Sequence, residues 1–218
     1  MNKINYEYIV EYIRSLTREE KGLESLREYA EENNIPIIQL EVKQFLKTLI
    51  KIKKPKNILE IGTAIAYSAM VMASEIEGKV YTIERNKDMI EIANKNIIEN
   101  NYDDRIEILE GDASNILKEF DKKIDLVFID GAKSHYEEFF DYILENLNEE
   151  AVIIADNILF KGMIANDDLV NRRNKTIVKR MRSFLEYIMS DNRFETSIIP
   201  IGDGVSVSYI RRFNGEKN

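Results

Sequence analysis

Two apolar runs of this 218-residue chain end on side chains that could hold a metal ion. The run at 124–130 ends on Asp130, and the run at 151–156 ends on Asp156, which is followed by Asn157. If both runs are strands of an open parallel sheet, their carboxyl ends meet at the edge where such sheets bind ligands. Two carboxylates and an amide oxygen are hard ligands of the kind that Mg²⁺, Mn²⁺ and Ca²⁺ prefer. The alternative is that each aspartate only caps a following helix, but the joint pattern favours a metal site.

A turn of the kind that binds nucleotide-like cofactors follows an earlier apolar run. Residues 57–61 predict a strand, and Gly62 begins the tight turn that leads into a helix. Glu84 ends the next predicted strand, near the offset at which an acidic residue binds ribose hydroxyls. Ala64 and Ala66 stand at the later glycine positions of a dinucleotide fingerprint, so a closely wrapped pyrophosphate is not expected.

Two acidic residues narrow the choice of cofactor. Glu60, just before the glycine, favours a cationic or amine-bearing ligand over a diphosphate. Asp112, in the turn Gly111-Asp112-Ala113 after the third strand, can accept a hydrogen bond from an adenine amino group. A phosphate-free adenosine with a positive centre is S-adenosylmethionine, which is the cofactor that the pattern implies.

The elements that must position these residues alternate along the chain. Strands are predicted at 57–61, 79–84, 105–109, 124–130 and 151–156, and helices at 65–76, 87–100, 114–119 and 136–147. Strict alternation predicts an α/β fold with a doubly wound, mainly parallel sheet and right-handed crossovers.

Both ends of the chain depart from this alternation. Helical patterns precede Pro55, and after a loop at 158–169 and one more helix, two strands around Gly202-Asp203-Gly204 predict a terminal β-hairpin. The helical patterns lie around Ile4 to Leu16, at 18–33 and at 40–50, and the hairpin strands lie at 194–200 and 205–210. We expect one domain over residues 1–218, with a helical extension at 1–54 and a Rossmann-like core at 55–218.

Composition excludes several classes of protein. With 44% hydrophobic and 32% charged residues the chain is globular, and no apolar run is long enough to span a bilayer. The N-terminus lacks the features of a secretory signal, so a cytoplasmic protein without membrane association is expected. Zero cysteines and one histidine exclude thiolate zinc sites and multi-histidine metal sites.

Positive charge is concentrated in two segments of a chain whose net charge is −8. Segments 43–56 and 171–182 each hold six basic residues and no acidic one. Such patches could contact a phosphate backbone, although solvated helix faces have the same composition.

Together the motifs resemble the cation-dependent O-methyltransferases of the caffeoyl-CoA and catechol type, over nearly the whole chain. The matching residues are 59–64, Tyr67-Ser68, Glu84, 111–113, 128–133, Tyr136, Asp156-Asn157 and 202–204. The resemblance is strongest to the branch that methylates 5-hydroxyuridine in bacterial tRNA, by the compact N-terminus and the segment from Ile154 to Gly162. One departure is Ala66, where glycine is usual, and its methyl group is expected to narrow the methionine pocket.

The resemblance implies a site with three groups of residues. Asp130, Asp156 and Asn157 would bind the metal, while Asp130 and Lys133 would be catalytic. The cofactor would be held by Ile38, Glu60, Gly62, Ser68, Glu84, Asp112, Ala113 and Asp130. Lys133 could take the proton of the substrate hydroxyl or stabilise the oxyanion, with a solvated lysine as the alternative.

Substrate and assembly are less constrained by the sequence. The expected substrate is 5-hydroxyuridine at the wobble position of a tRNA anticodon loop, contacted by Arg172, Arg173 and Tyr136. The alternatives are a small catechol, whose adjacent oxygens would chelate the same ion, and a cofactor-binding module that performs no methylation. The apolar stripe of the first helix, with Tyr6, Tyr8 and Tyr12 nearby, predicts a homodimer interface, and packing of this stripe on its own domain is the alternative.

Overall fold

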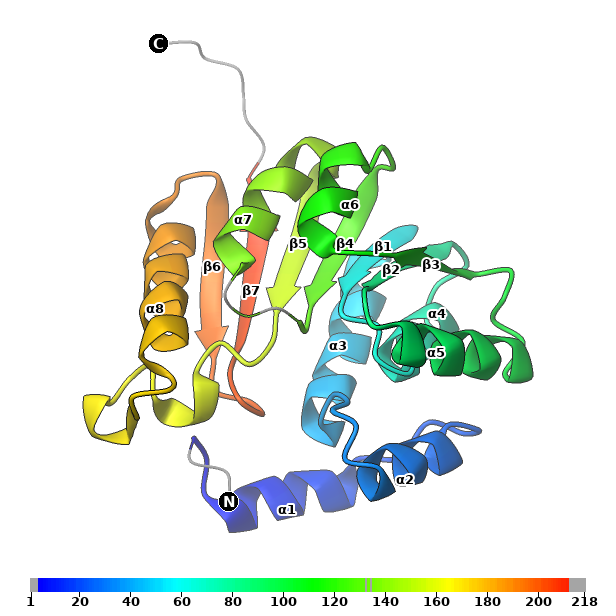
Figure 1. Ribbon diagram of the computed structural model, residues 1–218, viewed down its shortest axis with the longest axis horizontal. Coiled ribbons are helices and arrows are strands. Elements are labelled where there is room, and N and C mark those ends of the chain that lie inside the picture. Colours follow the sequence, from blue (N-terminus) through cyan, green and yellow to red (C-terminus); the bar gives the residue numbers. More distant parts are fainter. Residues whose placement is uncertain (1–3, 132, 134, 212–218) are drawn as a thin grey trace.

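One sheet forms the centre of the molecule (Figure 1). Its strands are β1 (Asn57–Ile61), β2 (Lys79–Glu84), β3 (Ile106–Glu110), β4 (Ile124–Ile129), β5 (Leu147–Ala155), β6 (Phe194–Ile199) and β7 (Val205–Ile210). The structure is a computed structural model, and it describes residues 4–131, 133 and 135–211. Within these ranges the strand order is β3-β2-β1-β4-β5-β7-β6, with β1 to β5 parallel and β7 antiparallel to its two neighbours. The predicted α/β fold with a terminal hairpin is therefore confirmed.

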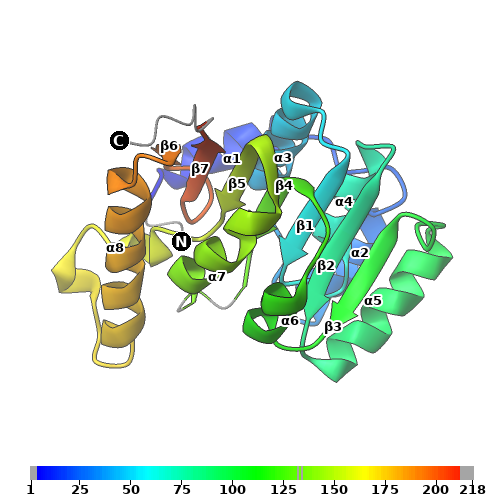
Figure 2. The ribbon, with the colours of Figure 1, turned by 90° about the horizontal axis from the view of Figure 1, so that it is seen from above.

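Helices cover both faces of the sheet. They are α1 (Glu7–Leu16), α2 (Glu24–Glu32), α3 (Leu40–Lys53), α4 (Tyr67–Ser74), α5 (Lys87–Glu99), α6 (Ala113–Glu119), α7 (Tyr136–Ile143) and α8 (Lys175–Ser190). Alternate residues of one strand point to opposite faces, so Phe128 packs with α3 and α4 while Ile129 packs with α7 and α8. Figure 2 shows α6, α7 and α8 together on one side of the strands. Both faces are thus apolar, which is why β1 and β4 read as nearly continuous hydrophobic runs.

Several elements differ in extent from the sequence-based expectation. α2 begins at Glu24 instead of near residue 18, because the backbone at Gly22 has a φ of 93°, which a right-handed helix does not allow. β5 begins at Leu147, and its pairing with β4 shifts register near the start. The expected helix over 136–147 ends in a short turn, η1 (Leu144–Asn146), and the expected loop contains two more, η2 (Phe160–Gly162) and η3 (Asp167–Leu169).

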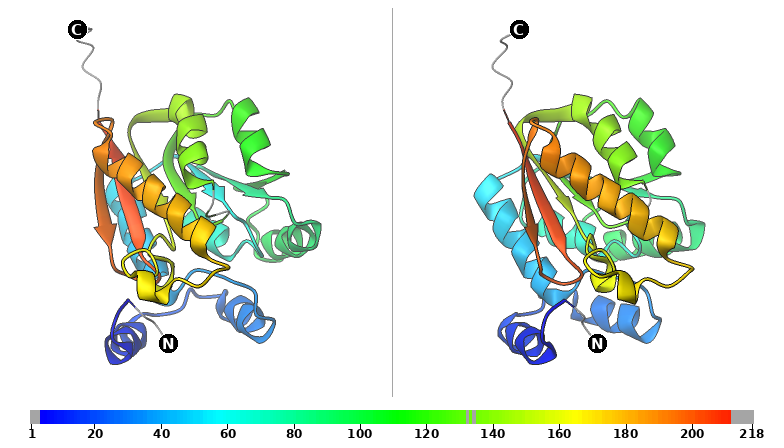
Figure 3. Two further views of the ribbon diagram at one scale, coloured as in Figure 1. Left: turned by 60° about the vertical axis from the view of Figure 1, so that its left-hand side comes forward. Right: turned by 90° about the vertical axis from the view of Figure 1, so that its left-hand side faces the viewer.

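The N-terminal helices α1 and α2 lie beyond the carboxyl ends of β1, β4 and β5, as both views of Figure 3 show from other sides. Arg14 fastens α1 to α3, because its guanidinium donates to both carboxylate oxygens of Glu41 at 2.7 and 2.9 Å. Near the start of α1, the Asn5 amide donates to the carbonyl of Pro200 at 2.6 Å. These contacts bring the helical extension to the ligand-binding edge of the sheet.

The basic segment 43–56 is not the free patch that its composition indicates. Lys43 is completely buried, and its ammonium group donates to Glu19 at 2.8 Å and to the carbonyl of Arg18 at 2.9 Å. Lys47 forms ion pairs with Glu20 and Glu75. Lys51 also pairs with Glu75, so three of the six lysines of the expected patch are paired with carboxylates. Among the described residues, no helix is long and apolar enough to cross a bilayer.

Candidate active site

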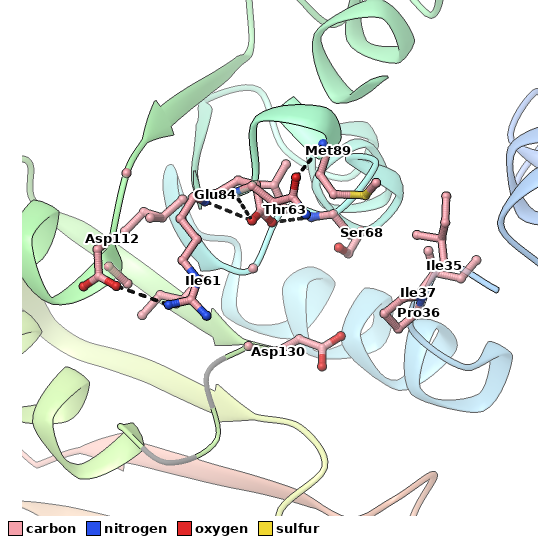
Figure 4. A pocket seen from close by; sticks show the side chains of 18 of the residues that line it. Ile35, Pro36, Ile37, Ile61, Thr63, Ser68, Glu84, Met89, Asp112 and Asp130 are labelled. Atoms are coloured by element: carbon pink, nitrogen blue, oxygen red, sulfur yellow. Dashed lines mark hydrogen bonds and ion pairs between the residues drawn. The ribbon is translucent and has the colours of Figure 1, made fainter. Parts of the chain in front are cut away.

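A cavity of about 490 Å³ opens at the carboxyl ends of β1 to β4. Its walls are formed by the turns after these four strands and by the loop between α2 and α3. Figure 4 shows Glu84 and Asp112 across the cavity from Ile35, Pro36 and Ile37. The volume lies in the range of about 300–1,000 Å³ that is usual for small-molecule sites. Apolar side chains with a few fixed polar groups suit an adenosine ligand.

Glu84 presents a carboxylate whose direction is fixed by backbone amides. One oxygen accepts from Ala64 N at 3.0 Å, and the other accepts from Arg85 N and Asn86 N at 2.9 Å each. The lone pairs that remain are available to ligand hydroxyls at the cavity wall. This geometry suits the predicted contact with ribose.

Asp112 and Ala113 lie where α6 begins, on the cavity wall. The Asp112 carboxylate caps α6 by accepting from Ser114 N at 3.1 Å, and it pairs with Arg85 at 3.6 Å. A capping carboxylate keeps unused lone pairs, so the cap leaves room for the predicted contact with an adenine amino group.

Gly62 lets the turn after β1 approach the end of β4 closely. Its φ is +107°, and a Cβ at this position would lie 2.8 Å from the carbonyl oxygen of Asp130. Only glycine adopts this conformation without strain and without that clash. The residue therefore brings the cofactor turn and the predicted metal ligand together.

Glu60 is fully buried and does not line the cavity. Its carboxyl group accepts hydrogen bonds from the hydroxyls of Ser68 and Thr82, the latter at 2.5 Å. Burial raises the pKa of Glu60 to about 7, against the opposite effect of these two hydrogen bonds. Because Ser68 does line the cavity, Glu60 reaches the ligand region through that hydroxyl rather than directly.

Two other residues differ from their expected placement. The side chain of Ile38 packs in the core, while its neighbours Ile35, Pro36 and Ile37 line the cavity. Ala66 is also fully buried and outside the cavity lining, with a left-handed φ of 66° at the N-cap of α4. Its methyl group therefore does not narrow this cavity.

Asp130 and Asp156 stand at equivalent ends of neighbouring strands. The preceding residues, Ile129 and Ala155, are register partners, and Asp156 N donates to the Ile129 carbonyl at 2.9 Å. Neither aspartate caps a helix, because the N-cap of α7 is His135 and that of η2 is Leu159, so the capping alternative is wrong.

The electrostatics of the pair follow from desolvation. Loss of water contact, together with the negative charge of Asp156, raises the pKa of Asp130 well above its usual range. Burial also raises the pKa of Asp156 to about 6, although hydrogen bonds from Asn157 act in the opposite direction. Two carboxylates and the Asn157 amide form a hard-oxygen donor set that fits a divalent cation. Within the described residues there is no group of three or more histidine, cysteine or acidic side chains that could hold a metal.

Lys133 and Tyr136 contact this donor set directly. The ammonium group of Lys133 donates to the side-chain oxygen of Asn157, and its positive charge partly opposes the burial that raises the pKa of both aspartates. Tyr136 is buried, and its hydroxyl donates to the backbone carbonyl of Asp156 at 3.0 Å. Tyr136 therefore supports the loop that carries two of the predicted ligands. Ala132, in the same motif as Lys133, lies outside the described residues.

Sequence reasoning assigned no role to several residues that the fold brings to the site. The segment Asn34 to Ile37 covers the cavity, and Met89 lines it. Asp203, in the β6–β7 turn, lies close enough to raise the pKa of Asp156. The apolar residues around Pro36 and the position of Asp203 between two glycines were the available signals, but neither has a period or spacing that indicates a ligand.

The geometry defines a class of protein, an α/β enzyme with an adenosine-type cavity beside a candidate cation site, and comparisons with known proteins agree. The sequence profile of a family described as O-methyltransferase matches residues 14–212. Caffeoyl-CoA O-methyltransferase of Medicago sativa is 29% identical over 93% of this chain and 86% of its own length. That of Populus kitakamiensis is 31% identical over 75% of this chain and 74% of its own length.

Solved structures agree with the sequence comparisons. A Staphylococcus aureus protein, crystallised as a candidate caffeoyl-CoA O-methyltransferase, is 33% identical with a TM-score of 0.84, covering 94% of this chain and 98% of that one. An O-methyltransferase of Bacillus cereus in complex with SAH is 27% identical with a TM-score of 0.82, covering 94% and 97%. The chain therefore belongs to the O-methyltransferase family of the caffeoyl-CoA type. It is an S-adenosylmethionine-dependent O-methyltransferase.

Proposed function

We propose that this enzyme requires a divalent cation and methylates 5-hydroxyuridine at the wobble position of tRNA. The observation that carries the metal requirement is the convergence of Asp130, Asp156 and Asn157 at the ends of β4 and β5. A bound cation would hold two adjacent substrate oxygens and lower the pKa of the hydroxyl to be methylated. The 5-hydroxyl and 4-carbonyl of 5-hydroxyuracil are such a pair, as are the two hydroxyls of a catechol.

The chain's own residues would orient the reactants and move the proton. Glu84 would hold the ribose, and the apolar residues Ile37 and Met89 would contain the adenine. Lys133 stands beside the ligand set, so its Nζ is the proposed acceptor of the hydroxyl proton when it is the neutral amine, or the partner of the oxyanion when it is the ammonium. Most of the rate enhancement would come from holding the methyl donor and the acceptor hydroxyl in one cavity, because methyl transfer needs these two groups in line.

Support for an RNA substrate comes from the loop before α8. Arg172 and Arg173 are exposed, and within the described part of the chain neither forms an ion pair. In Figure 1 this loop lies at the same edge of the sheet as the ends of β4 and β5. A second cavity, of about 520 Å³, lies beside the contact between α7 and α8 and is lined by Lys133 and Arg180 together with the acidic Glu137, Glu138 and Asp141. A splayed-out base beside a contacted backbone is the usual mode of single-stranded RNA recognition.

The metal requirement is tested with Asp156→Asn. This change keeps the size of the side chain but removes one charged ligand, so methylation should fall by about a hundredfold, the upper end of the loss seen when only a group that supports a metal ligand is changed. Calorimetry should show weaker binding of Mn²⁺, while SAH affinity stays unchanged. Full activity in excess chelator would contradict the metal requirement.

The substrate is tested with the double variant Arg172→Ala/Arg173→Ala. If tRNA is the substrate, its binding should weaken and the slope of log affinity against log salt should flatten by at most about two, because two phosphate contacts are lost. Methylation of free 5-hydroxyuridine should stay the same. The control Lys54→Ala/Lys56→Ala removes the same charge from residues that precede β1, at the opposite edge of the sheet.

A small catechol is the second candidate, favoured by the names of the caffeoyl-CoA-type relatives. Equal methylation of tRNA by the arginine variant and the native enzyme, together with efficient methylation of a catechol, would favour it. Equal loss on tRNA and free nucleoside would instead place the arginines in the pocket or in the fold.

A further inference from the structure

A carboxylate outside the cavity joins the parts of the chain that enclose it. Glu19 lies in the loop between α1 and α2, and its side chain is 18% exposed. One of its oxygens accepts from Lys43 Nζ at 2.8 Å, from Glu20 N at 2.9 Å and from the hydroxyl of Tyr67. The other accepts from Arg27 Nε at 2.6 Å. Donors from α2, α3 and α4 therefore meet on one side chain.

Two of these donors belong to the enclosure of the cofactor cavity. Tyr67 lines the cavity, and its hydroxyl is held by Glu19. Arg27 lies over the Tyr67 ring, with its guanidinium carbon 4.6 Å from the ring centroid. Arg27 also donates to the carbonyl of Ile38 at 3.0 Å, at the end of the segment that covers the cavity. Glu19 thus connects the segment 34–38, which we call the cover, to Tyr67 in the cavity wall.

The cluster sets one carboxylate against two cations and is largely removed from water. Lys43 is fully buried and the Arg27 side chain is only 12% exposed. Although burial acts to raise it, hydrogen bonds from Lys43 and Tyr67 lower the pKa of Glu19 to about 2. Burial and the hydrogen bond to Glu19 raise the pKa of Tyr67, so the tyrosine stays a neutral donor. Buried charge-assisted hydrogen bonds of this kind hold their partners in one geometry.

We propose that Glu19 is a positioning residue for the cofactor, which holds the segment 34–38 and Tyr67 in the arrangement that binds S-adenosylmethionine. Within the described residues the cover is anchored on its own side by the bond from Ile35 N to the Ala30 carbonyl and by the buried Ile38 side chain, while Arg27 and Glu19 connect it to Tyr67 in the wall. A binding site that is formed only part of the time has an affinity reduced by that fraction. This inference rests on the cofactor and is independent of the metal and the substrate.

The test compares Glu19→Gln with Glu20→Gln. Both changes remove one negative charge from the same loop and break a bridge to α3, but Glu20 contacts Lys47 and neither Arg27 nor Tyr67. SAH is the probe, with calorimetry for its Kd and stopped flow for its dissociation rate. If the cover is formed about a tenth of the time without Glu19, the Kd should rise about tenfold in Glu19→Gln. It should stay within about twofold of native in Glu20→Gln.

Two further measurements separate positioning from stability. Hydrogen exchange of peptides covering 33–39 should speed up in Glu19→Gln and not in Glu20→Gln. At saturating S-adenosylmethionine kcat should be retained while KM for the cofactor rises. A lowered Tm with unchanged SAH affinity would overturn the proposal, as would an equal loss of affinity in both variants.

A second variant keeps the proposal testable if Glu19→Gln does not fold. Tyr67→Phe retains the ring in the cavity wall and removes only the hydroxyl that donates to Glu19. SAH affinity should fall several-fold. If Glu19→Gln does fold, the two losses should not add in the double variant, because they affect the same hydrogen bond. Unchanged affinity in Tyr67→Phe would overturn the proposal.

Discussion

At the scale of single residues, Glu60 shows how burial changes the role of a motif residue. Its carboxyl is completely enclosed and shares a chain of hydrogen bonds with Ser68, Thr82 and Thr63. A carboxylate in this position would be poorly solvated, so burial raises its pKa to about 7. The residue therefore acts on Ser68 and the strand β2, and its charge depends on pH.

This predicts a pH-dependent stability that the variant Glu60→Gln removes. The folded pKa of about 7 is above the ordinary value of 4.5, so the unfolded chain releases the proton first as pH rises. The contribution of Glu60 to stability is therefore present below about pH 4.5 and is lost between there and about pH 7. The cofactor-free Gln variant should gain up to roughly 3 kcal/mol relative to native between pH 4.5 and 8.

Urea unfolding of both proteins across this range measures the effect. The Glu60→Gln variant can keep the hydrogen bond to Thr82. Either hydroxyl of the Thr63–Thr82 pair can be the donor, so the Thr82 hydroxyl can donate to Thr63 and accept from the new amide. A constant difference in unfolding free energy from pH 4.5 to 8 would contradict the raised pKa.

At the scale of elements, the site depends on how closely the turn after β1 approaches β4. Gly62 N donates to the Ile83 carbonyl at 3.0 Å, and Asp130 N donates to the Ile61 carbonyl at 3.0 Å. The turn is thus fixed on both sides, and there is no room for a side chain between it and Asp130. One backbone approach positions both the cofactor cavity and a predicted metal ligand.

We expect Gly62→Ala to reduce both stability and SAH affinity. A left-handed alanine costs about 1–2 kcal/mol, and the clash with the Asp130 carbonyl adds to that. Gly22→Ala is a matched control, because Gly22 has a φ of +93° with nothing within 4 Å of the added Cβ. The control should lose stability through strain alone and bind SAH normally. Chemical denaturation and calorimetry give the two quantities, and equal behaviour of the variants would show that the close approach is unimportant.

At the scale of the whole molecule, α1 carries an apolar face that the other described residues leave uncovered. Tyr8, Tyr12 and Leu16 are 65–67% exposed, while Val10 on the other face is buried. The contacts of Arg14 and Asn5 hold the helix in place, so the exposed face is presented in a fixed orientation. Contiguous exposed apolar surface of this kind usually marks an interface.

We therefore propose a homodimer in which this face of α1 is buried. Tyr12→Glu/Leu16→Glu should convert a dimer to a folded monomer, because two charges would have to be desolvated at the interface. Sedimentation velocity at micromolar concentration measures the change. Ile98→Glu, at a site on α5 that is 64% exposed, is the control and should leave the assembly intact. A native protein that sediments as a monomer would contradict the proposal.

Sequence by itself determined the order of elements and the residues at the strand ends. Alternating apolar runs and amphipathic segments predict strands and helices because these patterns are local. The same order places Glu84, Asp112, Asp130 and Asp156 at one edge of a parallel sheet, without knowledge of any distant contact.

Only the tertiary structure decided which charges are free and which are buried. Lys43 resembles its neighbouring lysines in the sequence, but its partner Glu19 lies 24 residues away, and only the packing of α3 brings the two together. For the same reason Ile38 is a core residue while Ile37 lines the cavity. Contacts between segments far apart in the chain have no local pattern, so the enclosure of the cofactor cavity and its connection to Glu19 became visible only in the fold.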